Sequence, residues 1–273
     1  MQAFLLSTAA TDEDELVAGL WELGTAGIEE RARANDRLTV LAYFEDGVIG
    51  EEALRAALGG GVEVQSTPVP DVDWVARFRE GFRAFAASGF WIAPVWDSAA
   101  TPPGFRRLVV DPGRAFGTGT HESTALCLDA LERLAAQGPL GRVLDVGTGT
   151  GILAVAAAQL GATAVCASDL DPESIDSARA HAALNDRTLA VVRADGGRGF
   201  AAGRFDTVIA NITAPLLIER AAELSVLPGP GGRLVLAGLL AEERFAVRAA
   251  YGAFPAAEET LRGEWASLTL ARR

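Results

Sequence analysis

The chain has 273 residues, 49% of them hydrophobic, and carries a formal net charge of −12. This length suits a catalytic domain with a smaller companion, and the hydrophobic content is too high for a disordered chain. No uninterrupted apolar run reaches the ~20 residues that cross a bilayer, and the first ten residues lack the basic start of a signal peptide. We therefore expect a soluble, cytoplasmic protein without a membrane partner, whose acidity makes nucleic acid a poor partner.

The basic and sulfur-containing side chains exclude several enzyme classes. All 24 basic residues are Arg, so a Walker-type phosphate lysine, a Schiff-base lysine and a lysine general base are excluded. An enzyme of this composition that acts on lysine could not modify its own side chains. The two cysteines, Cys127 and Cys166, have no metal or redox spacing, and we expect buried small hydrophobes and no metal site.

The first quarter of the chain predicts a small α+β unit. Alternating and helical patterns predict strands at 3–8, 37–44 and 62–67, helices at 12–23 and 51–58, and one further strand near 28–33. This order resembles a ferredoxin-like module. Residues 2–64 hold 13 acidic side chains against 4 Arg. That bias indicates either a solvated surface or recognition of a basic partner.

A connector follows Pro68 and Pro70, which end the first unit. Residues 73–87 predict a helix whose aromatic side chains pack against a neighbouring domain, at Trp74, Phe78, Phe82 and Phe85. Residues 90–96 and 107–110 predict strands. We therefore divide the chain into a ferredoxin-like domain (1–67), a linker helix and connecting strand (68–97) and a larger domain (98–273).

A polar, glycine-containing loop at 111–124 precedes a predicted helix at 125–136. Thr120 or Ser123 is suited to cap that helix, and the glycines allow the loop to close over a ligand. The loop holds His121, for which a role in a pocket and a structural hydrogen bond remain equal alternatives. The other histidine, His181, lies on a predicted helix at 172–185, and we expect it at the surface.

A glycine turn forms the centre of the larger domain. Residues 143–146 predict a buried strand and 152–160 a helix, joined by Gly147, Gly149 and Gly151. A dinucleotide fingerprint would need glycine at position 152, which is Ile152. Asp145 precedes the turn and suits the ammonium group of S-adenosylmethionine, while N–H groups of the turn and the helix start suit its carboxylate. The alternative is a glycine-rich turn in another α/β protein.

Polar residues end the neighbouring predicted strands at 164–167, 189–193 and 205–210. Asp169 is placed to accept hydrogen bonds from both ribose hydroxyls, and Asp195 to contact the adenine amino group. Asp171 more simply caps the helix that begins at Pro172. Asn211 ends the fourth strand. Because ligands bind beyond the carboxyl ends of parallel strands, we expect Gly147, Asp169, Asp195 and Asn211 to converge.

The remaining pattern completes a sheet. A helix to about 226, a strand at 233–237, a helix at 241–250 and strands at 258–262 and 265–270 predict an α/β, Rossmann-like sheet of seven strands.

Four motifs together carry a family resemblance. They are Phe-Gly-Thr-Gly-Thr-His at 116–121, Leu-Asp-Val-Gly-Thr-Gly-Thr-Gly-Ile-Leu-Ala at 144–154, Asp-Leu-Asp-Pro at 169–172 and Ala-Asn-Ile at 210–212. The chain resembles, over nearly its whole length, the bacterial methyltransferases of large-subunit ribosomal protein eleven. The resemblance implies a class I methyltransferase domain and an N-terminal domain that recognises the substrate. It also implies transfer of methyl groups from S-adenosyl-L-methionine, with S-adenosyl-L-homocysteine as product, to lysine ε-amino and N-terminal α-amino groups of that basic ribosomal protein.

The resemblance also implies site residues. Cofactor contacts fall on Thr124, Gly147, Asp169 and Asn211, to which we add Gly149, Asp195 and Phe116. Asn211 and His121 are the residues we expect to hold the acceptor amine. Two departures from the family pattern, Glu122-Ser123 in place of Pro-Thr and Thr148 in place of Cys, remove none of these polar contacts.

Two other functions remain as alternatives. Methyltransferases of nucleic-acid bases or protein glutamine carry Asn-Pro-Pro-Tyr where this chain has Asn-Ile-Thr-Ala, and its acidity also disfavours nucleic acid. A non-catalytic ribosome-assembly module would bind the cofactor without transfer. We expect a monomeric enzyme.

Overall fold

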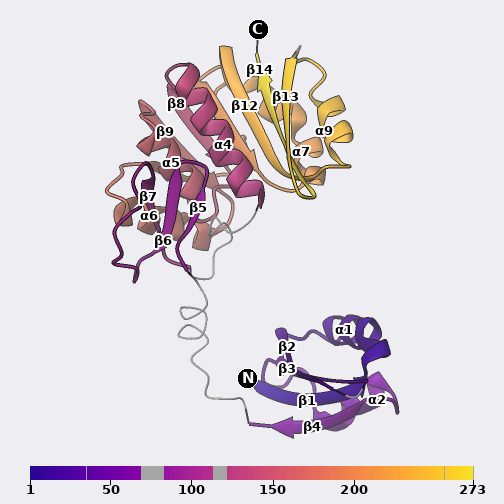
Figure 1. Ribbon diagram of the computed structural model, residues 1–273. Coiled ribbons are helices and arrows are strands. Elements are labelled where there is room, and N and C mark those ends of the chain that lie inside the picture. The colour runs from indigo at the N-terminus through magenta and orange to yellow at the C-terminus, as the bar shows by residue number, and fades with distance from the viewer. Residues whose placement is uncertain (35, 69–82, 113–121, 255, 273) are drawn as a thin grey trace. The chain divides into compact units, whose positions relative to one another are not determined.

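The computed structural model describes residues 1–34, 36–68, 83–112, 122–254 and 256–272. The chain divides into two compact units, Met1–Trp74 and Val75–Arg273 (Figure 1). Each unit has its own hydrophobic core, as expected of separate domains. Among the described residues, none of the helices is both long enough and apolar enough to cross a membrane.

The first unit is a four-stranded antiparallel sheet with two helices, in the order expected of a ferredoxin-like module. Its elements are β1 Gln2–Ala9, a 3-10 turn at Ala10–Asp12, α1 Glu13–Glu22, β2 Gly27–Ala34, β3 Arg37–Phe44, α2 Glu51–Leu58 and β4 Glu63–Thr67. The strand order is β2-β3-β1-β4. The additional strand predicted near 28–33 is therefore confirmed as β2, which lies at one edge of the sheet.

Alternation along the strands creates the core of this unit. Side chains at every second position of β1 and β3 are buried with residues of both helices, including Phe4, Leu6, Leu16, Leu20, Leu38, Val40, Phe44 and Leu54. The ring of Phe4 meets that of Phe44 edge to face at 5.9 Å between centroids.

The second unit contains the seven-stranded sheet that the sequence predicts. Its strands are β8 Arg142–Val146, β9 Ala164–Asp169, β10 Ala190–Arg193, β11 Phe205–Asn211, β12 Pro228–Leu240, β13 Ala256–Arg262 and β14 Trp265–Ala271. The order is β10-β9-β8-β11-β12-β14-β13, with the first five strands parallel and β14 antiparallel to both neighbours. This is the class I methyltransferase sheet, and its order reverses between β8 and β11, where α/β proteins bind ligands.

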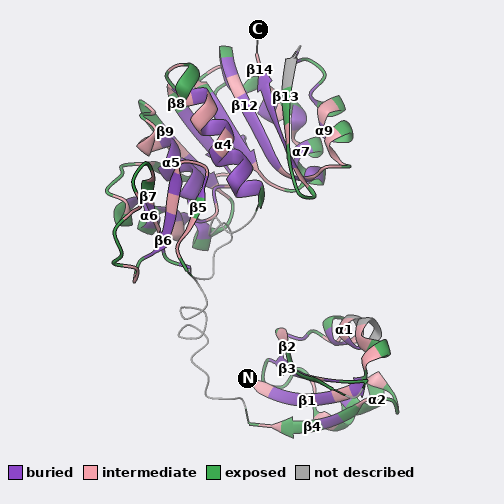
Figure 2. Cartoon of the chain, in the orientation of Figure 1, coloured by how far each residue is buried: buried purple, intermediate pink, exposed green. Residues whose placement is uncertain are grey.

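Helices cover both faces of this sheet. One core joins it to α4 Glu122–Gln137 and α5 Ile152–Gln159. The other core joins it to α7 Ala214–Glu219, α8 Ala221–Val226 and α9 Arg244–Ala250 (Figure 2). Pro172–Leu184 form α6, which contacts β9 and β10. The single helix predicted up to residue 226 is two short helices, because the chain leaves helical geometry at Arg220.

A separate three-stranded sheet packs onto the first of these cores. It consists of β5 Phe85–Ala87, β6 Phe90–Pro94 and β7 Arg106–Val110. The prediction of a helix as far as residue 87 is wrong at Phe85, which pairs with Ile92 in an antiparallel ladder. Helical spacing of aromatic residues does not distinguish a helix from a strand that begins part-way through the pattern. Trp74, Phe78 and Phe82 lie outside the described residues.

Side chains complete the outer edge of β7. Asn185 receives the N–H of Val109 and donates to its carbonyl, both at 2.8 Å. Gln159 donates to the carbonyl of Arg107 at 3.0 Å. Amide side chains thus satisfy backbone groups that a further strand would otherwise pair.

His181 extends the same row of contacts, and the prediction that it lies at the surface is wrong. Only 3% of the residue is exposed. Its Nε2 accepts the N–H of Asp111 at 3.0 Å, so Nδ1 carries the proton and donates to the Ser177 carbonyl at 2.8 Å. The sequence of α6 does not show that β7 packs against the side of the helix that carries His181.

Candidate active site

The glycine turn between β8 and α5 requires glycine for steric reasons. Gly147, Gly149 and Gly151 have φ angles of +69°, +54° and +78°, which other residues adopt at a cost. A Cβ at Gly147 would lie 2.5 Å from Cγ2 of Ile212, and one at Gly151 would lie 2.9 Å from Cα of Ala178. The turn therefore packs closely against the segment after β11 and against α6.

Most N–H groups of the turn are used within the protein. Those of Gly147 and Thr148 both donate to the Ser168 carbonyl, at 2.8 and 3.0 Å. Gly149 donates to Oδ2 of Asp169 at 2.9 Å, and Gly151 to the Thr148 carbonyl. The expectation that these N–H groups are available to an anionic ligand is wrong for these four, because three of them bind the end of β9 and the fourth closes the turn itself.

Asp169 lies at the end of β9, where the sequence predicts a ribose contact. Besides Gly149, the N–H of Asp171 donates to it, reaching Oδ1 at 3.1 Å. These two bonds fix the carboxylate, and each oxygen keeps a lone pair for a further donor. Asp171 itself caps α6 by accepting from the N–H of Glu173 at 3.0 Å, which confirms the predicted cap.

Leu170, between these two aspartates, is a further candidate that the sequence did not single out. Its side chain is 57% exposed although it follows a buried strand. An exposed leucine beside a fixed carboxylate offers an apolar surface against which a planar base can pack. The signal available in the sequence was its position between two acidic residues at a strand end.

Asn211 ends β11, and Thr124 lies in the first turn of α4. The Nδ2 of Asn211 donates to Oγ1 of Thr124 at 3.5 Å, a long contact. Thr124 is buried and Asn211 is partly exposed. This contact directs the amide so that its Oδ1 can accept a hydrogen bond from a ligand.

Asp145 is buried beneath the turn. Its Oδ2 accepts the hydroxyl of Thr148 at 2.6 Å, and the N–H of Ala154 in α5 also donates to it. Burial raises the pKa of this carboxyl to about 6, against the lowering effect of these two donors. The carboxylate thus secures the start of α5, and its predicted attraction for an ammonium group stays a prediction.

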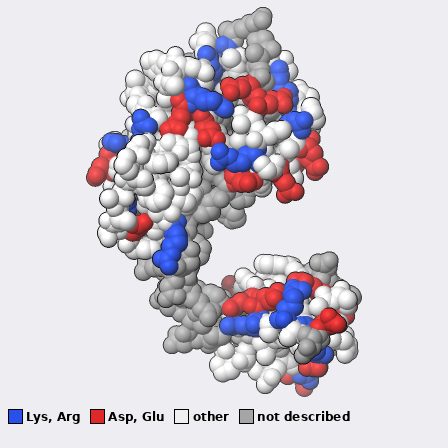
Figure 3. Space-filling model, in the orientation of Figure 1, with Lys and Arg blue, Asp and Glu red and all other residues white. Residues whose placement is uncertain are grey.

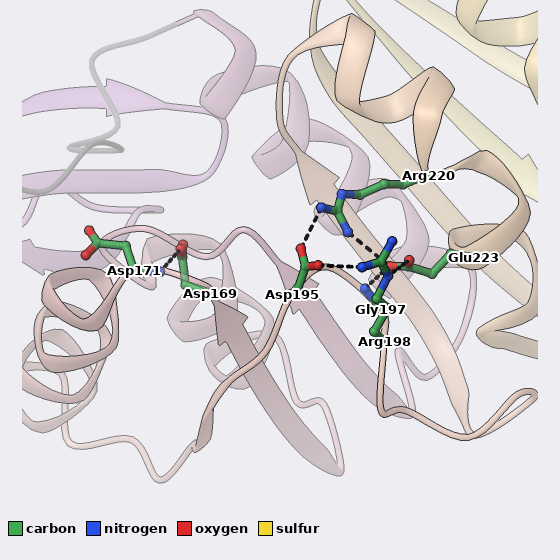
Figure 4. A network of polar contacts seen from close by, with 7 residues as sticks. All are labelled: Asp169, Asp171, Asp195, Gly197, Arg198, Arg220 and Glu223. Atoms are coloured by element: carbon green, nitrogen blue, oxygen red, sulfur yellow. Dashed lines mark hydrogen bonds and ion pairs between the residues drawn. The ribbon is translucent and has the colours of Figure 1, made fainter.

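Asp195 follows β10, and two arginines bind its carboxylate. Arg220 donates to Oδ1 at 2.5 Å and Arg198 to Oδ2 at 2.9 Å (Figure 4). Sequence reasoning found Asp195 but not these arginines. Arg198 lies only three residues after Asp195, whereas the ion pair with Arg220 joins distant segments and leaves no local pattern.

The strand order brings the predicted positions to one edge. Four strands are neighbours in the sheet, in the order β10, β9, β8 and β11. The residues at or just after their ends are, in the same order, Asp195, Asp169, Gly147 and Asn211. Phe116 and His121 lie outside the described residues. The arrangement combines a close-packed glycine turn, a fixed carboxylate and an oriented amide, which suits a nucleoside ligand beside an acceptor group.

Comparisons with known proteins identify the family. Residues 6–273 match the model of the ribosomal protein L11 methyltransferase (PrmA) family. The chain is 38% identical over 257 residues to the ribosomal protein L11 methyltransferase of Geobacter sulfurreducens, covering 89% of this chain and 83% of that protein. It is 35% identical over 270 residues to the one of Myxococcus xanthus, covering 93% and 92%.

A solved structure supports the same assignment. The ribosomal protein L11 methylase of Lactobacillus delbrueckii subsp. bulgaricus is 30% identical and superposes with a TM-score of 0.64, covering 70% of this chain and 100% of that one. The family match spans both units of the fold, and its members depend on S-adenosylmethionine. This chain therefore belongs to the ribosomal protein L11 methyltransferase family.

Proposed function

We propose that the chain transfers methyl groups from S-adenosylmethionine to lysine ε-amino groups and the N-terminal α-amino group of ribosomal protein L11. The observation that carries this proposal is the Asn211–Thr124 pair, at the sheet edge that also holds the glycine turn and Asp169. The names of the relatives support the substrate, since they are L11 methyltransferases.

The residues at this edge fit the cofactor. At Gly149 the backbone has no Cβ, so a ligand can approach it closely, whereas the Cβ position of Gly147 is filled by Ile212. The remaining lone pairs of Asp169 suit two ribose hydroxyls, and the exposed side of Leu170 suits the adenine ring. When bound, S-adenosylmethionine supplies a methyl group on a positively charged sulfur.

The protein's own contribution is to hold the acceptor amine. A lysine amine has an ordinary pKa of about 10.4 and must lose a proton before it can act as a nucleophile. We propose that Oδ1 of Asn211 and the loop that carries His121 orient the neutral amine, and that its proton leaves to water. Positioning then accounts for most of the rate enhancement.

We further propose a division of labour along the chain. Residues 1–67 recognise the substrate, 68–97 form the connection, and 98–273 bind the cofactor and carry out transfer. Exposed acidic side chains in the first unit, such as Asp46 and Glu63, support recognition of a basic protein. On the face drawn in Figure 3, acidic and arginine side chains of this unit lie beside one another. We propose that the enzyme is cytoplasmic, because its substrate, a ribosomal protein, is made in the cytoplasm. We also propose that it is a monomer.

A transfer assay tests the reaction. The purified chain is incubated with methyl-labelled S-adenosylmethionine and purified L11, and mass spectrometry then locates the methyl groups. We expect label on lysine and N-terminal amines, with Asn211→Ala slower by at least ~100-fold and Thr124→Ser close to wild type. Full turnover by Asn211→Ala would contradict the role of Asn211, and cofactor binding without transfer would indicate a non-catalytic module.

Kinetics with altered surface charge test substrate recognition. Replacing Glu45, Asp46 and Glu52 by the corresponding amides should raise the KM for L11 severalfold and leave kcat unchanged. The same change at Glu173 and Asp176, exposed acids of the second unit, is the control. Equal effects from both sets would argue against recognition by the first unit.

A further inference from the structure

Asp195 is held by two arginines of unequal exposure. The Nη2 of Arg220 lies 2.5 Å from Oδ1, and the Nη1 of Arg198 lies 2.9 Å from Oδ2. The side chain of Arg220 is only 16% exposed, whereas that of Arg198 is 68% exposed. Water and salt therefore screen the Arg198 contact more strongly, and Arg220 is the main restraint on the carboxylate.

The backbone of Arg220 lies at the junction between α7 and α8, and its side chain is mostly buried. Glu223 in α8 completes the network. It accepts the N–H of Gly197 and lies 3.7 Å from Arg220 and 3.4 Å from Arg198 (Figure 4). The network thus joins the turn after β10 to the start of α8.

The turn after β10 fits tightly against this network. Gly196 has a φ of +63°, and a Cβ there would lie 2.5 Å from Oε1 of Glu223 and 2.6 Å from Nη1 of Arg220. At its beginning, the turn is also bound to the end of β9, since the N–H of Ala194 donates to the Asp169 carbonyl at 2.9 Å. The carboxylates of Asp169 and Asp195 are therefore carried by neighbouring, mutually restrained strand ends.

We propose that Arg220 is a positioning residue for adenine recognition. Its bond to Asp195 holds that carboxylate in one orientation, in which a remaining lone pair accepts a hydrogen bond from the exocyclic amino group of adenine. Without the bond to Arg220, the Asp195 carboxylate would rotate freely. Cofactor binding would then have to restrict this rotation, which costs binding free energy. The inference rests on the proposed function in one respect, that the ligand is S-adenosylmethionine.

Base selectivity follows from this arrangement. Hypoxanthine has a carbonyl oxygen where adenine has its amino group, so its oxygen would face a carboxylate without a proton between them. A site built around a hydrogen bond rejects an analogue that cannot form it. The Arg220–Asp195 pair therefore determines the preference for adenine over hypoxanthine.

Calorimetry on the intact chain tests the inference without a turnover assay. The Kd is measured for S-adenosylhomocysteine and for its deaminated analogue, S-inosylhomocysteine. Compared with wild type, Arg220→Met should bind S-adenosylhomocysteine at least ~10-fold more weakly and S-inosylhomocysteine almost equally well. The ratio of the two Kd values should therefore move towards one. Arg220→Lys should restore part of the preference for adenine. Arg179→Met, which removes an exposed arginine paired with Asp176 and not with Asp195, is the control and should stay within ~2-fold of wild type.

The outcomes separate positioning from structural support. Equal weakening of both ligands by Arg220→Met, or no change in either, would overturn the inference. Should Arg220→Met fail to fold, Asp195→Asn provides the same comparison, and an unchanged preference in that variant would also overturn it. A wild-type chain that binds neither ligand would instead refute the proposed cofactor, and this inference with it.

Discussion

Cγ2 of Ile212 occupies the space that a side chain at Gly147 would need, 2.5 Å from the position of its Cβ. The residue directly after Asn211 thus packs onto the first glycine of the glycine turn. Ile212 is confined from a second direction, because a Cβ at Gly238 in β12 would lie 2.5 Å from its carbonyl oxygen. The position of Asn211 therefore depends on two glycines that do not adjoin it in sequence.

Gly147→Ala should disturb both the turn and Asn211. The substitution places a methyl group against Ile212 at a φ of +69°, and we expect a loss of about 1–3 kcal/mol in the free energy of unfolding. S-adenosylhomocysteine binding should weaken by at least ~10-fold, measured by calorimetry. Gly161→Ala is the control, because its φ is +89° but nothing lies within 4 Å of the added Cβ. An equal loss of binding in both variants would exclude the contact with Ile212 as the cause.

Asp145 should make the free energy of unfolding fall as the pH rises, which is the opposite of the usual effect of a carboxylate. Burial raises its pKa from 3.8 to about 6, so the folded chain binds this proton more tightly than the unfolded chain. Its contribution to stability is therefore fully present below about pH 4 and is lost as the pH rises through about 6. Asp145→Asn cannot ionise and should be more stable than wild type above pH 6 by roughly 2–3 kcal/mol, measured by urea denaturation.

Asp206 provides a control of opposite sign. The backbone N–H and side chain of Arg142 lower the pKa of its carboxyl. Its contribution is present above the ordinary pKa of 3.8 and is lost as the pH falls through the lowered value. Asp206→Asn should therefore be less stable than wild type at neutral pH. A gain at neutral pH in both variants would indicate a general effect of net charge.

Asn185 should contribute to stability in two separable parts. Asn185→Ala leaves both the N–H and the carbonyl of Val109 without this partner, and we expect a loss of about 2–4 kcal/mol. Asn185→Asp keeps an acceptor for the N–H but places a carboxylate oxygen against the carbonyls of Val109 and His181, so its loss should be larger than that of Asn185→Ala. Thermal and urea denaturation measure both losses, and equal losses would contradict the added cost of the carboxylate.

The cysteines should be unreactive in the folded chain. Cys127 is completely buried and Cys166 is partly buried, and burial raises the pKa of both thiols. Alkylation by iodoacetamide at pH 7.5 should be at least ~100-fold slower at Cys127 than in unfolded protein, with Cys166 intermediate. Peptide mass spectrometry distinguishes the two sites. Rapid alkylation of Cys127 in folded protein would contradict its burial.

The sequence could predict the sheet because each central strand is a short apolar run between glycines and polar ends. Val143, Leu144 and Val146 show this pattern, and the structure buries all three. The residues at strand ends could also be located, since parallel strands bring their carboxyl ends to one edge. Asp171 was predictable as a cap because proline follows it at the first helical position.

Contacts between distant segments could not be predicted. Phe85 continues a helical spacing but pairs as a strand, because its partner Ile92 lies across a turn whose Gly89 N–H is bound by Glu132 of α4. His181 lies on α6 and Arg220 lies between α7 and α8, and the sequence around neither residue shows that it will be mostly buried. Their burial and partners are decided by β7 and by the turn after β10, which approach only in the folded chain.

The helix α6 is anchored by hydrogen bonds at each end. Its first turn follows Asp169 and is capped by Asp171, while His181 and Asn185, near its other end, hold Asp111 and Val109. Thirteen residues span about 20 Å as a helix, and such a rod does not shorten or bend easily. A displacement of the chain at Asp169 should therefore also displace the point where the chain leaves β7, so that the two regions move together.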